Sequence, residues 1–449
     1  MANTYLSKTL GTPTNNIKWT WSTWIKRSKI TGSQQRMFFA VNGSNYTTIQ
    51  FDDEQYLIWF NEIGGTDMQL KTSRQFRDTN AWMNLVFVYD SANATAADRQ
   101  IIYVNGERQT AFLDENTAGS SVTTAINQAV VHNIASGPGA ANFYEGSMSH
   151  IHFIDGTAYP ATAFGSVDST SGIWKINTSP SVTYGNNGFF ILKDGNTITD
   201  SSPNSNDFAL GGGTLTKTQD CPSNNFITLN PLNAFYTNST FSNGNTTFAS
   251  GSSYSGTTAN ILLSTGKWYW EGKPISKDGD GDNYVFGIQG QDSTATNQFV
   301  GSQSTGYQIY GANGNLYNNN SGATYAAAFT AGDIIGVALD CTNNKLYFSK
   351  NGAWSTGSGA WGSTTFNAST GAKTITAPAS VTLGGYYPSQ TFWTGNSGTF
   401  SMNFGNGYFG TTAVTTNSGN GYAGTDGKSI FNYQPPTGYS ALSTKGLNL

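Results

Sequence analysis

The sequence predicts a nearly all-β chain with two antiparallel β-sandwich (jelly-roll) domains joined by a loop-rich connector. Its composition is 37% hydrophobic and 14% aromatic but only 11% charged, which favours strands over helices. Short alternating runs recur at roughly 10-residue spacing between Gly, Asn, Asp and Ser residues, as in sandwiches. The length of 449 residues is enough for two or three domains with real cores.

The first domain is predicted to span residues 1–156. Its opening strand alternates with period two, so that Trp19 and Trp21 share one face. Trp24 falls on the opposite, otherwise polar face, which predicts that both faces of this strand are covered. Further strands are expected at RMFFAV (36–41), TTIQFD (47–52), YLIWFN (56–61), MQLKT (68–72), MNLVFVYD (83–90), RQIIYVNG (99–106) and SMSHIHFIDG (147–156).

A connector is predicted at residues 157–233, where the pattern loosens into polar, Gly-rich sequence. Within it, NGFFILK (187–193) is expected to add one strand to a neighbouring sheet. The second sandwich is placed at 234–410 and a C-terminal extension at 411–449. The strands of the second sandwich are expected at NTTFAS (245–250), NILLSTGKWYWEGK (260–273), NYVFGIQG (283–290), GYQIYG (306–311), DIIGVALD (333–340), KLYFSKNG (345–352), SVTLGGYY (380–387) and TFSMNFGNGYF (399–409).

Asn-Gly pairs end one strand in each predicted domain, at Asn105-Gly106 and Asn351-Gly352. This pair after an alternating strand is the strongest short-range signal of a two-residue hairpin, because both positions need positive φ. The two pairs therefore predict structural turns and not functional sites.

Several segments of the first domain resemble the laminin G-like branch of the concanavalin A-like lectin/glucanase superfamily. They are WTWSTWIKRS, FRDTNAWMNLVFVYDS, DRQIIYVNGERQ and FYEGSMSHIHFIDGTAY. In the second domain, STGKWYWEG, YVFGIQG, AGDIIGVALDCTNNKLYFSKNG and SMNFGNGYF resemble a SPRY-type sandwich. This order of modules, with the connector DCPSNNFITLNPL and the ending PPTGYSALSTKGLNL, is similar to a group of virion proteins from tailed phages.

That resemblance implies a phage virion structural protein displayed on the particle surface, with non-catalytic binding to host-surface glycan. The alternatives are a purely structural capsid decoration or tail accessory protein and a polysaccharide depolymerase. We expect no enzyme, because no stretch matches the E-x-D-x-x-E pattern of the glucanases and Asp52 and Glu54 lack the rest of it. No Gly-x-Ser-x-Gly elbow occurs either. The expected partners are other virion proteins of capsid or tail and further copies of the chain.

Charge and hydropathy argue against two classes of partner. The formal net charge of −4 and the pI near 5.4 predict no nucleic-acid partner. No window approaches the roughly 18 apolar residues of a membrane span, so no membrane insertion is expected. The N-terminus lacks the pattern of a signal peptide, which suits a virion protein made in the host cytoplasm. Head and tail positions on the particle stay open.

No cofactor or established metal site is predicted. His150 and His152 stand at i and i+2, which would place two imidazoles on one strand face, but no third ligand is visible. Asp278, Asp280 and Asp282 alternate in KDGDGDN, and calcium or an ordinary polar hairpin tip both remain open for this loop. The two cysteines, Cys221 and Cys341, are expected to be free and buried, although their pairing cannot be determined from the sequence.

The candidate ligand-binding residues lie in GGYYPSQTFWTGNSG (384–398), where Gly and Pro indicate a loop. Aromatic faces that stack on sugar rings, beside amide groups that form hydrogen bonds, are typical of glycan sites. Packing of the same aromatics onto the sandwich, or against a neighbouring subunit, is the alternative. The residues of this candidate site are Tyr386, Tyr387, Gln390, Trp393 and Asn396.

Overall fold

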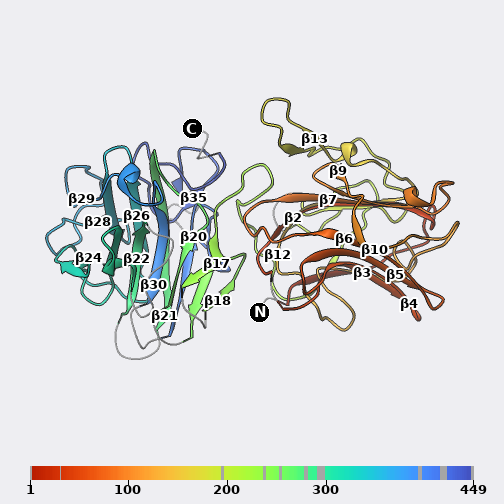
Figure 1. The fold of residues 1–449 in the computed structure, drawn as a ribbon, viewed down its shortest axis with the longest axis horizontal. Coiled ribbons are helices and arrows are strands. Elements are labelled where there is room, and N and C mark those ends of the chain that lie inside the picture. Colours follow the sequence, from red (N-terminus) through yellow and green to blue (C-terminus); the bar gives the residue numbers. More distant parts are fainter. Residues whose placement is uncertain are drawn as a thin grey trace. The chain divides into compact units, whose positions relative to one another are not determined.

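The chain forms two compact units of nearly pure β-structure in the computed structural model (Figure 1). The structure describes residues 3–30, 32–193, 197–235, 239–251, 255–277, 282–290, 299–392, 397–414 and 422–445. The units are Met1–Lys217 with Cys221–Ser223, and Thr218–Asp220 with Asn224–Leu449. Helix in the described residues is limited to the 3-10 turns η1 (Ala96–Asp98), η2 (Ala161–Ala163), η3 (Val300–Ser302) and η4 (Pro378–Ser380). The predicted all-β class is confirmed.

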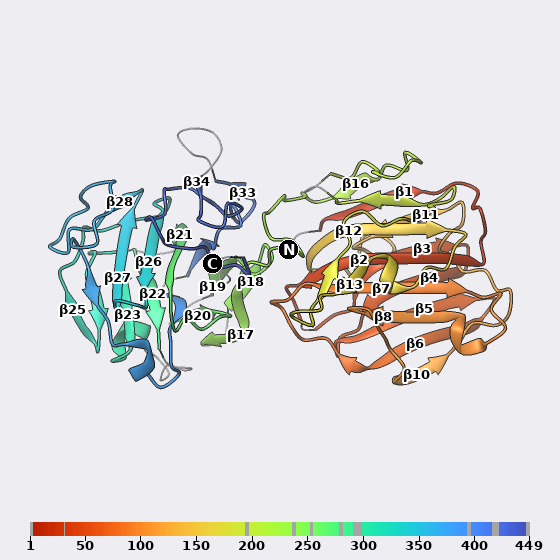
Figure 2. The same cartoon turned by 90° about the horizontal axis from the view of Figure 1, so that it is seen from above.

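The first unit is a sandwich of two antiparallel sheets (Figure 2). The larger sheet has the spatial order β10 (Phe112–Asn116), β6 (Thr66–Gln75), β5 (Tyr56–Ile63), β4 (Asn45–Phe51), β3 (Gln35–Asn42), β11 (Val131–Ile134), β1 (Tyr5–Thr9) and β16 (Ala209–Gly212). The smaller sheet has the order β15 (Phe189–Ile191), β12 (Gly146–Asp155), β2 (Lys18–Arg27), β7 (Met83–Asp90), β8 (Gln100–Val104) and β9 (Glu107–Arg108). Between the sheets lies an aromatic core in which Trp19, Trp21 and Trp59 have no exposed surface.

The outer face of the smaller sheet is covered by the segment that follows β12. This segment carries η2, β13 (Gly165–Val167) and β14 (Trp174–Ile176). Val86 and Val88 of the sheet pack against Ala161 and Phe164 of the segment, which removes apolar surface from water on this second face. Trp24, on the same face, is only 4% exposed. The prediction that both faces of its strand are covered is confirmed.

Most of the predicted connector, residues 157–233, therefore belongs to the first unit, which runs to Lys217. Its strand β15 pairs with β12, and this confirms the strand expected from NGFFILK. Its strand β16 pairs with β1 and forms one edge of the larger sheet. The alternating pattern is lost between residues 158 and 184 because this part of the segment contacts the smaller sheet through scattered apolar residues and not through one continuous face.

Asp155, at the end of β12, holds several loops of the first unit together. Its buried carboxylate accepts hydrogen bonds from the backbone of Thr14 (2.6 Å), Asn15 (3.2 Å) and Asn187 (3.1 Å). It also accepts one from Asn127 Nδ2 at 2.8 Å. One side chain thus satisfies four donors from three separate loops, which explains why an acidic residue is buried at this position.

We expect Asp155→Ala to lower the free energy of unfolding of the first unit by about 3 kcal/mol, because four donors lose their buried acceptor. Asp155→Asn should cost less, since its amide oxygen still accepts from part of this set. Hydrogen exchange of strand amides, followed by mass spectrometry, would measure both losses within this unit. Equal stability of wild type and Asp155→Ala would contradict the assignment.

The second unit is also a sandwich of two antiparallel sheets (Figure 2). One has the order β17 (Leu229–Phe235), β20 (Ser255–Ala259), β30 (Tyr387–Phe392), β22 (Tyr284–Gln289), β23 (Gly306–Tyr310), β24 (Leu316–Asn318) and β25 (Ser321–Ala323). The other has the order β18 (Ser239–Ser242), β19 (Thr247–Ser250), β31 (Gly398–Asn403), β21 (Lys267–Lys277), β26 (Ile335–Asp340), β27 (Lys345–Lys350) and β28 (Ala353–Trp354), with β29 (Lys373–Thr374) also paired to β27. Trp270, Phe286 and Phe400 lie in the core between them.

A C-terminal segment covers the outer face of the sheet that contains β21. Phe431 and Tyr439 pack in one cluster with Tyr269 of β21. The backbone of Ser440 bonds to β21 through Lys267 and Tyr269, at 2.9 Å each. Short pairs in this region are β32 (Tyr408–Phe409) with β33 (Thr412–Ala413) and β34 (Tyr422–Ala423) with β35 (Ile430–Phe431). Much of the predicted extension 411–449 is thus packed on the second unit.

Both Asn-Gly pairs form the turns that the sequence predicts. Asn105 and Gly106 have φ of 49° and 79°, and Asn351 and Gly352 have φ of 50° and 82°. These turns join β8 to β9 and β27 to β28. A Cβ at Gly106 would lie 2.3 Å from the Trp174 ring, so this glycine also permits a close approach of the covering segment.

Candidate binding sites

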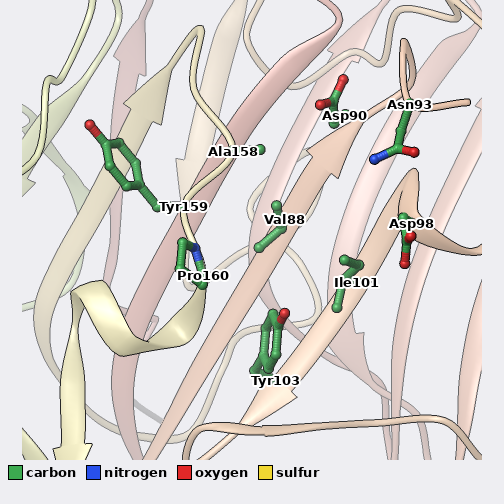
Figure 3. Close-up of a pocket in the computed structure, with 9 residues that line it drawn as sticks. All are labelled: Val88, Asp90, Asn93, Asp98, Ile101, Tyr103, Ala158, Tyr159 and Pro160. Carbon is green, nitrogen blue, oxygen red and sulfur yellow. The ribbon is translucent and has the colours of Figure 1, made fainter. Parts of the chain in front are cut away.

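A hollow of about 200 Å³ opens on the first unit, on the outer face of the smaller sheet (Figure 3). Its floor is apolar, with Val88 from β7 and Ile101 from β8. Two tyrosines line it, Tyr103 from β8 and Tyr159 from the segment after β12. The remaining lining residues are Asp90, Asn93, Asp98, Ala158 and Pro160. We call this site the tyrosine hollow.

The carboxylates of the tyrosine hollow each have a basic partner. Asp90 Oδ2 lies 2.9 Å from Lys18 Nζ, and Asp98 Oδ1 lies 2.7 Å from Arg108 Nη1. Neither basic residue lines the hollow, whereas both acidic residues do. The Oδ1 atom of Asp90 is buried and has no hydrogen-bond partner in the described structure. Among the described residues, the carboxylate of Asp90 is thus ion-paired through one oxygen and has no hydrogen bond at the other.

The tyrosine hollow could not be found from sequence alone. Its residues come from two segments about 55 positions apart, on either side of a long stretch that belongs to other strands. Tyr159 follows the expected end of the first domain and was assigned to the connector. Only the alternation in strand 99–106, which places Ile101 and Tyr103 on one face, was a usable signal.

The second unit has a loop surface at residues 326–330, in which Ala327, Ala328 and Thr330 are exposed. The carbonyl of Ala327 accepts a hydrogen bond from Trp361 Nε1 (2.9 Å), and that of Ala328 accepts one from Lys350 Nζ (3.2 Å). Thr330 Oγ1 donates to Asp282 Oδ1 at 2.9 Å. Three separate segments, those of Trp361, Lys350 and Asp282, are thereby bonded to this short loop.

Half-buried aromatic residues border this loop surface. Lys350 Nζ lies 5.9 Å from the ring centre of Trp361, a cation–π geometry. Tyr310 donates a hydrogen bond to Asn283 and packs edge-on against Tyr317 at 6.0 Å. Burial and the nearby Asp282 raise the pKa of Tyr310, so its hydroxyl stays a neutral donor at physiological pH.

The candidate ligand-binding residues predicted from sequence occupy different environments. Tyr386 has no exposed surface and donates a hydrogen bond to Thr376 O at 2.8 Å. Gln390 also has no exposed surface, and Tyr387 is half-buried. Trp393 and Asn396 lie outside the described residues. Ligand binding by this set stays a prediction, but Tyr386 and Gln390 belong to the core of the unit.

The stretch 384–398 is not one loop as expected, because it contains β30. This strand pairs with β20 on one side and β22 on the other. Pro388 suggested a loop, since proline cannot donate to a sheet ladder. In the structure β20 pairs only with Ser389 to Phe392. Pro388 thus lies beyond the end of that neighbour, where no donor is needed.

The histidine pair does not have the simple alternation that the sequence suggested. A bulge between Ser149 and His152 interrupts the register of β12, and His150 has a φ of 48°. His152 is buried, with its Nδ1 2.9 Å from the Tyr184 hydroxyl and its ring stacked 3.9 Å from that of Phe190. Among the described residues, no three His, Cys, Asp or Glu side chains are grouped to hold a metal ion.

Other residues singled out in the sequence have structural surroundings. Lys71 forms ion pairs with Asp52 (2.8 Å) and Glu54 (3.4 Å). Cys221 and Cys341 are both free, and only Cys341 is buried. Asp278 and Asp280 of the acidic loop lie outside the described residues. In the described part of the chain, no helix is long and apolar enough to cross a bilayer.

Two family models match the chain, one in each unit. The model of the concanavalin A-like lectin/glucanases superfamily matches residues 2–162, and the SPRY domain model matches residues 267–403. The chain therefore contains a laminin G-like domain followed by a SPRY domain. This result confirms the two fold resemblances that the sequence showed.

Curated relatives match over short segments. The Ran-binding proteins 9/10 homolog of Drosophila melanogaster is 33% identical over 93 residues, which cover 20% of this chain and 10% of the relative. Ran-binding protein 9 of Homo sapiens is 31% identical over 93 residues, which cover 20% of this chain and 12% of the relative. The matched segments thus span about a tenth of these relatives' lengths.

Two solved structures match parts of this chain with low similarity. The SPRY domain of human HERC1 has a TM-score of 0.30 at 19% identity and covers 39% of this chain and 96% of that chain. A putative carbohydrate binding protein from Bacteroides ovatus has a TM-score of 0.28 at 15% identity and covers 48% of this chain and 58% of that chain. At these identities and scores, neither likeness bears on function.

The predicted function as a phage virion protein is wrong. The curated relatives include Ran-binding proteins 9 and 10 of animals and the dual specificity protein kinase splA of Dictyostelium discoideum, and these matches carry no link to phages. The order of the two modules misled the prediction, because sandwiches of these families carry unrelated functions. The expected display on a particle and glycan attachment, the capsid-decoration alternative and the depolymerase are all withdrawn with it. A homo-oligomer and the absence of nucleic-acid and membrane partners stay predictions.

Proposed function

We propose that this chain is a non-enzymatic protein-binding protein whose SPRY unit holds a partner at the loop surface around residues 326–330. The observation that carries this proposal is the set of half-buried aromatics, Tyr310, Tyr317 and Trp361, on a surface fixed by backbone hydrogen bonds. Tyrosine and tryptophan dominate the binding energy of protein interfaces because they bury large areas at low entropic cost.

The surface also has the charge pattern of an interface rim. Lys350 and Asp282 are each held by a hydrogen bond to the loop or its neighbour, so little side-chain entropy is lost when a partner binds. The relatives that share this type of domain are named Ran-binding proteins, and this supports a protein as the partner class. Which protein binds is left to experiment.

Selection of peptides from a random library on the immobilised full chain would test this function. We expect enriched peptides to bind the wild type and to bind the Trp361→Ala variant at least tenfold more weakly. One interface tryptophan contributes roughly 2 kcal/mol or more to binding. Leu232→Ala is the matched control, because Leu232 is 60% exposed on edge strand β17, outside this surface.

The readout is the dissociation constant of each selected peptide, measured by calorimetry on variants that unfold at the same temperature as the wild type. Peptides that bind Trp361→Ala as tightly as wild type, or a library that yields no binder, would rule out this surface as the partner site.

A further inference from the structure

We propose that the tyrosine hollow of the first unit binds the cationic side chain of a lysine or arginine presented by a partner protein. This inference is independent of the SPRY surface, since every residue of the hollow belongs to the first unit. It rests on three properties of the hollow, namely its charge, its aromatic walls and its size.

The acidic side chains of the hollow favour a positively charged ligand. Asp90 and Asp98 line the hollow, while their partners Lys18 and Arg108 do not. A ligand in the hollow can therefore reach the Asp98 carboxylate, whose side chain is 36% exposed. The side chain of Asp90 is 15% exposed, and a carboxylate that is largely removed from water interacts more strongly with an opposite charge than one on an open surface.

Tyr103 strengthens the same preference. Tyr159 is held in place because its hydroxyl accepts a hydrogen bond from Thr183 N at 3.0 Å, while its own backbone N–H donates to Thr20 Oγ1 at 2.9 Å. Tyr103 faces the hollow from β8 (Figure 3). Aromatic faces attract ammonium and guanidinium groups through their quadrupole, so the Tyr103 ring would add to the attraction of the carboxylates for a cation, while the Tyr159 ring points away from them (Figure 3).

Size and apolar lining define the rest of the ligand. The volume of about 200 Å³ is below the roughly 300 Å³ at which drug-sized sites begin, and it suits a single side chain. Val88, Ile101 and Pro160 supply apolar surface, against which the methylene stem of lysine or arginine packs while its charged head reaches the rim. A hydrophilic cation without such a stem would leave this surface exposed.

Titration of the full chain with Nα-acetyl-lysine methylamide and Nα-acetyl-arginine methylamide, followed by saturation-transfer NMR, would test this site. Nα-acetyl-norleucine methylamide is the neutral control, since it keeps the apolar stem and lacks the charge. We expect at least one cationic probe to saturate the site with an affinity at least tenfold higher than that of the norleucine probe. This affinity should fall as added salt screens the carboxylates. Equal binding of charged and neutral probes, or no saturation by either cation, would overturn the proposal.

Two variants of the same chain locate the site. Asp90→Asn and Asp98→Asn each remove one charge with almost no change of shape. Each should lower the affinity of the chain for the cationic probe at least fivefold. Asp98 is more exposed than Asp90, so Asp98→Asn remains informative if Asp90→Asn is less stable. Asp114→Asn on β10, an exposed acid of the larger sheet, is the matched control. Binding that falls as much with Asp114→Asn as with the hollow variants would also overturn the assignment.

Discussion

Lowering the pH from about 7 to about 4 is expected to destabilise the first unit by about 3 kcal/mol through His132 alone. This side chain on β11 has no exposed surface. Its Nε2 accepts the Asn127 backbone N–H at 3.1 Å, so its ring proton is on Nδ1, 2.9 Å from Val130 O. Burial lowers the pKa of His132 from 6.5 to about 4, because an imidazolium would lose its hydration there.

The direction in which stability changes with pH follows from the number of protons bound by the folded and unfolded chains. Between pH 6.5 and about 4 the unfolded chain binds a proton at this histidine and the folded chain does not, so stability falls as the pH falls through this window. The pKa of His152 is also lowered well below 6.5, by burial first and then by His150 and Lys193. Its effect has the same sign and adds to that of His132.

Hydrogen exchange of strand amides in the first unit, measured at several pH values in this range, would quantify the loss. His132→Gln keeps an acceptor for Asn127 but does not titrate. We expect this variant to be less stable at neutral pH and its pH slope to be smaller than that of wild type by up to about 1.4 kcal/mol per pH unit. An unchanged slope would show that His132 is not responsible.

Glu271→Ala is expected to lower the free energy of unfolding of the second unit by about 4 kcal/mol, with the C-terminal segment affected most. Glu271 on β21 has no exposed surface. Its carboxylate accepts hydrogen bonds from the backbone of Tyr433 (2.8 Å) and Asn432 (2.9 Å). Asn403 Nδ2 (3.0 Å) and the Tyr269 hydroxyl (3.2 Å) complete the set. Without the carboxylate, the backbone N–H groups of Asn432 and Tyr433 lose their acceptor, and Asn403 Nδ2 keeps only its bond to Ile430 O.

The same residue gives the second unit a pH dependence of opposite sign. Burial raises the pKa of Glu271 from 4.5 to about 7, although its four hydrogen bonds act in the other direction. The folded state therefore binds a proton that the unfolded state has released. The stability from this group is fully present below pH 4.5 and is lost as the pH rises through about 7, by about 3 kcal/mol.

Glu271→Gln separates the two effects, because glutamine has the same shape and does not titrate. We expect the loss of stability between pH 4.5 and about 7 to disappear in this variant. Exchange of the Tyr433 and Ser440 amides would report on the C-terminal segment directly. If Glu271→Gln keeps the wild-type slope, or if Glu271→Ala leaves these amides protected, the role assigned to Glu271 is incorrect.

These opposite signs allow each unit to serve as the reference for the other in one sample. A change of buffer or of salt would shift both units together, whereas protonation of His132 and Glu271 shifts them apart. The difference between their exchange rates is thus the quantity that tests both predictions.

Strong alternation made much of the fold predictable. The run MNLVFVYD coincides with β7 (Met83–Asp90), and the pairing of β15 with β12 was expected from NGFFILK. Short edge strands such as β10 and β16 were missed, because exposed strands contain polar residues and lack a buried face. The run SVTLGGYY was expected to be a strand, yet it contains the end of η4 and a turn, and the strand starts only at Tyr387.

The sites were far less predictable than the strands. Aromatic residues near Gly and Pro suggested a surface loop at 384–398, but sequence cannot tell an aromatic that stacks on a ligand from one that fills a core, and Tyr386 fills a core. The tyrosine hollow depends on how the segment after β12 crosses the sheet. Such a contact between distant segments is set by tertiary packing and leaves no local pattern.

The closure of the second unit has a consequence for its biosynthesis. Its two ends are joined by backbone hydrogen bonds, from Ile227 to Leu442 (3.0 Å) and from Thr444 to Asn225 (2.9 Å). While a nascent chain is being elongated, these bonds cannot form before residue 444 has been made, and until the C-terminal segment is in place Tyr269 and its aromatic neighbours lack their cover. Domains at the N-terminal side fold first during translation. The outer aromatic face of the second unit therefore stays uncovered until the last part of the described chain has been made.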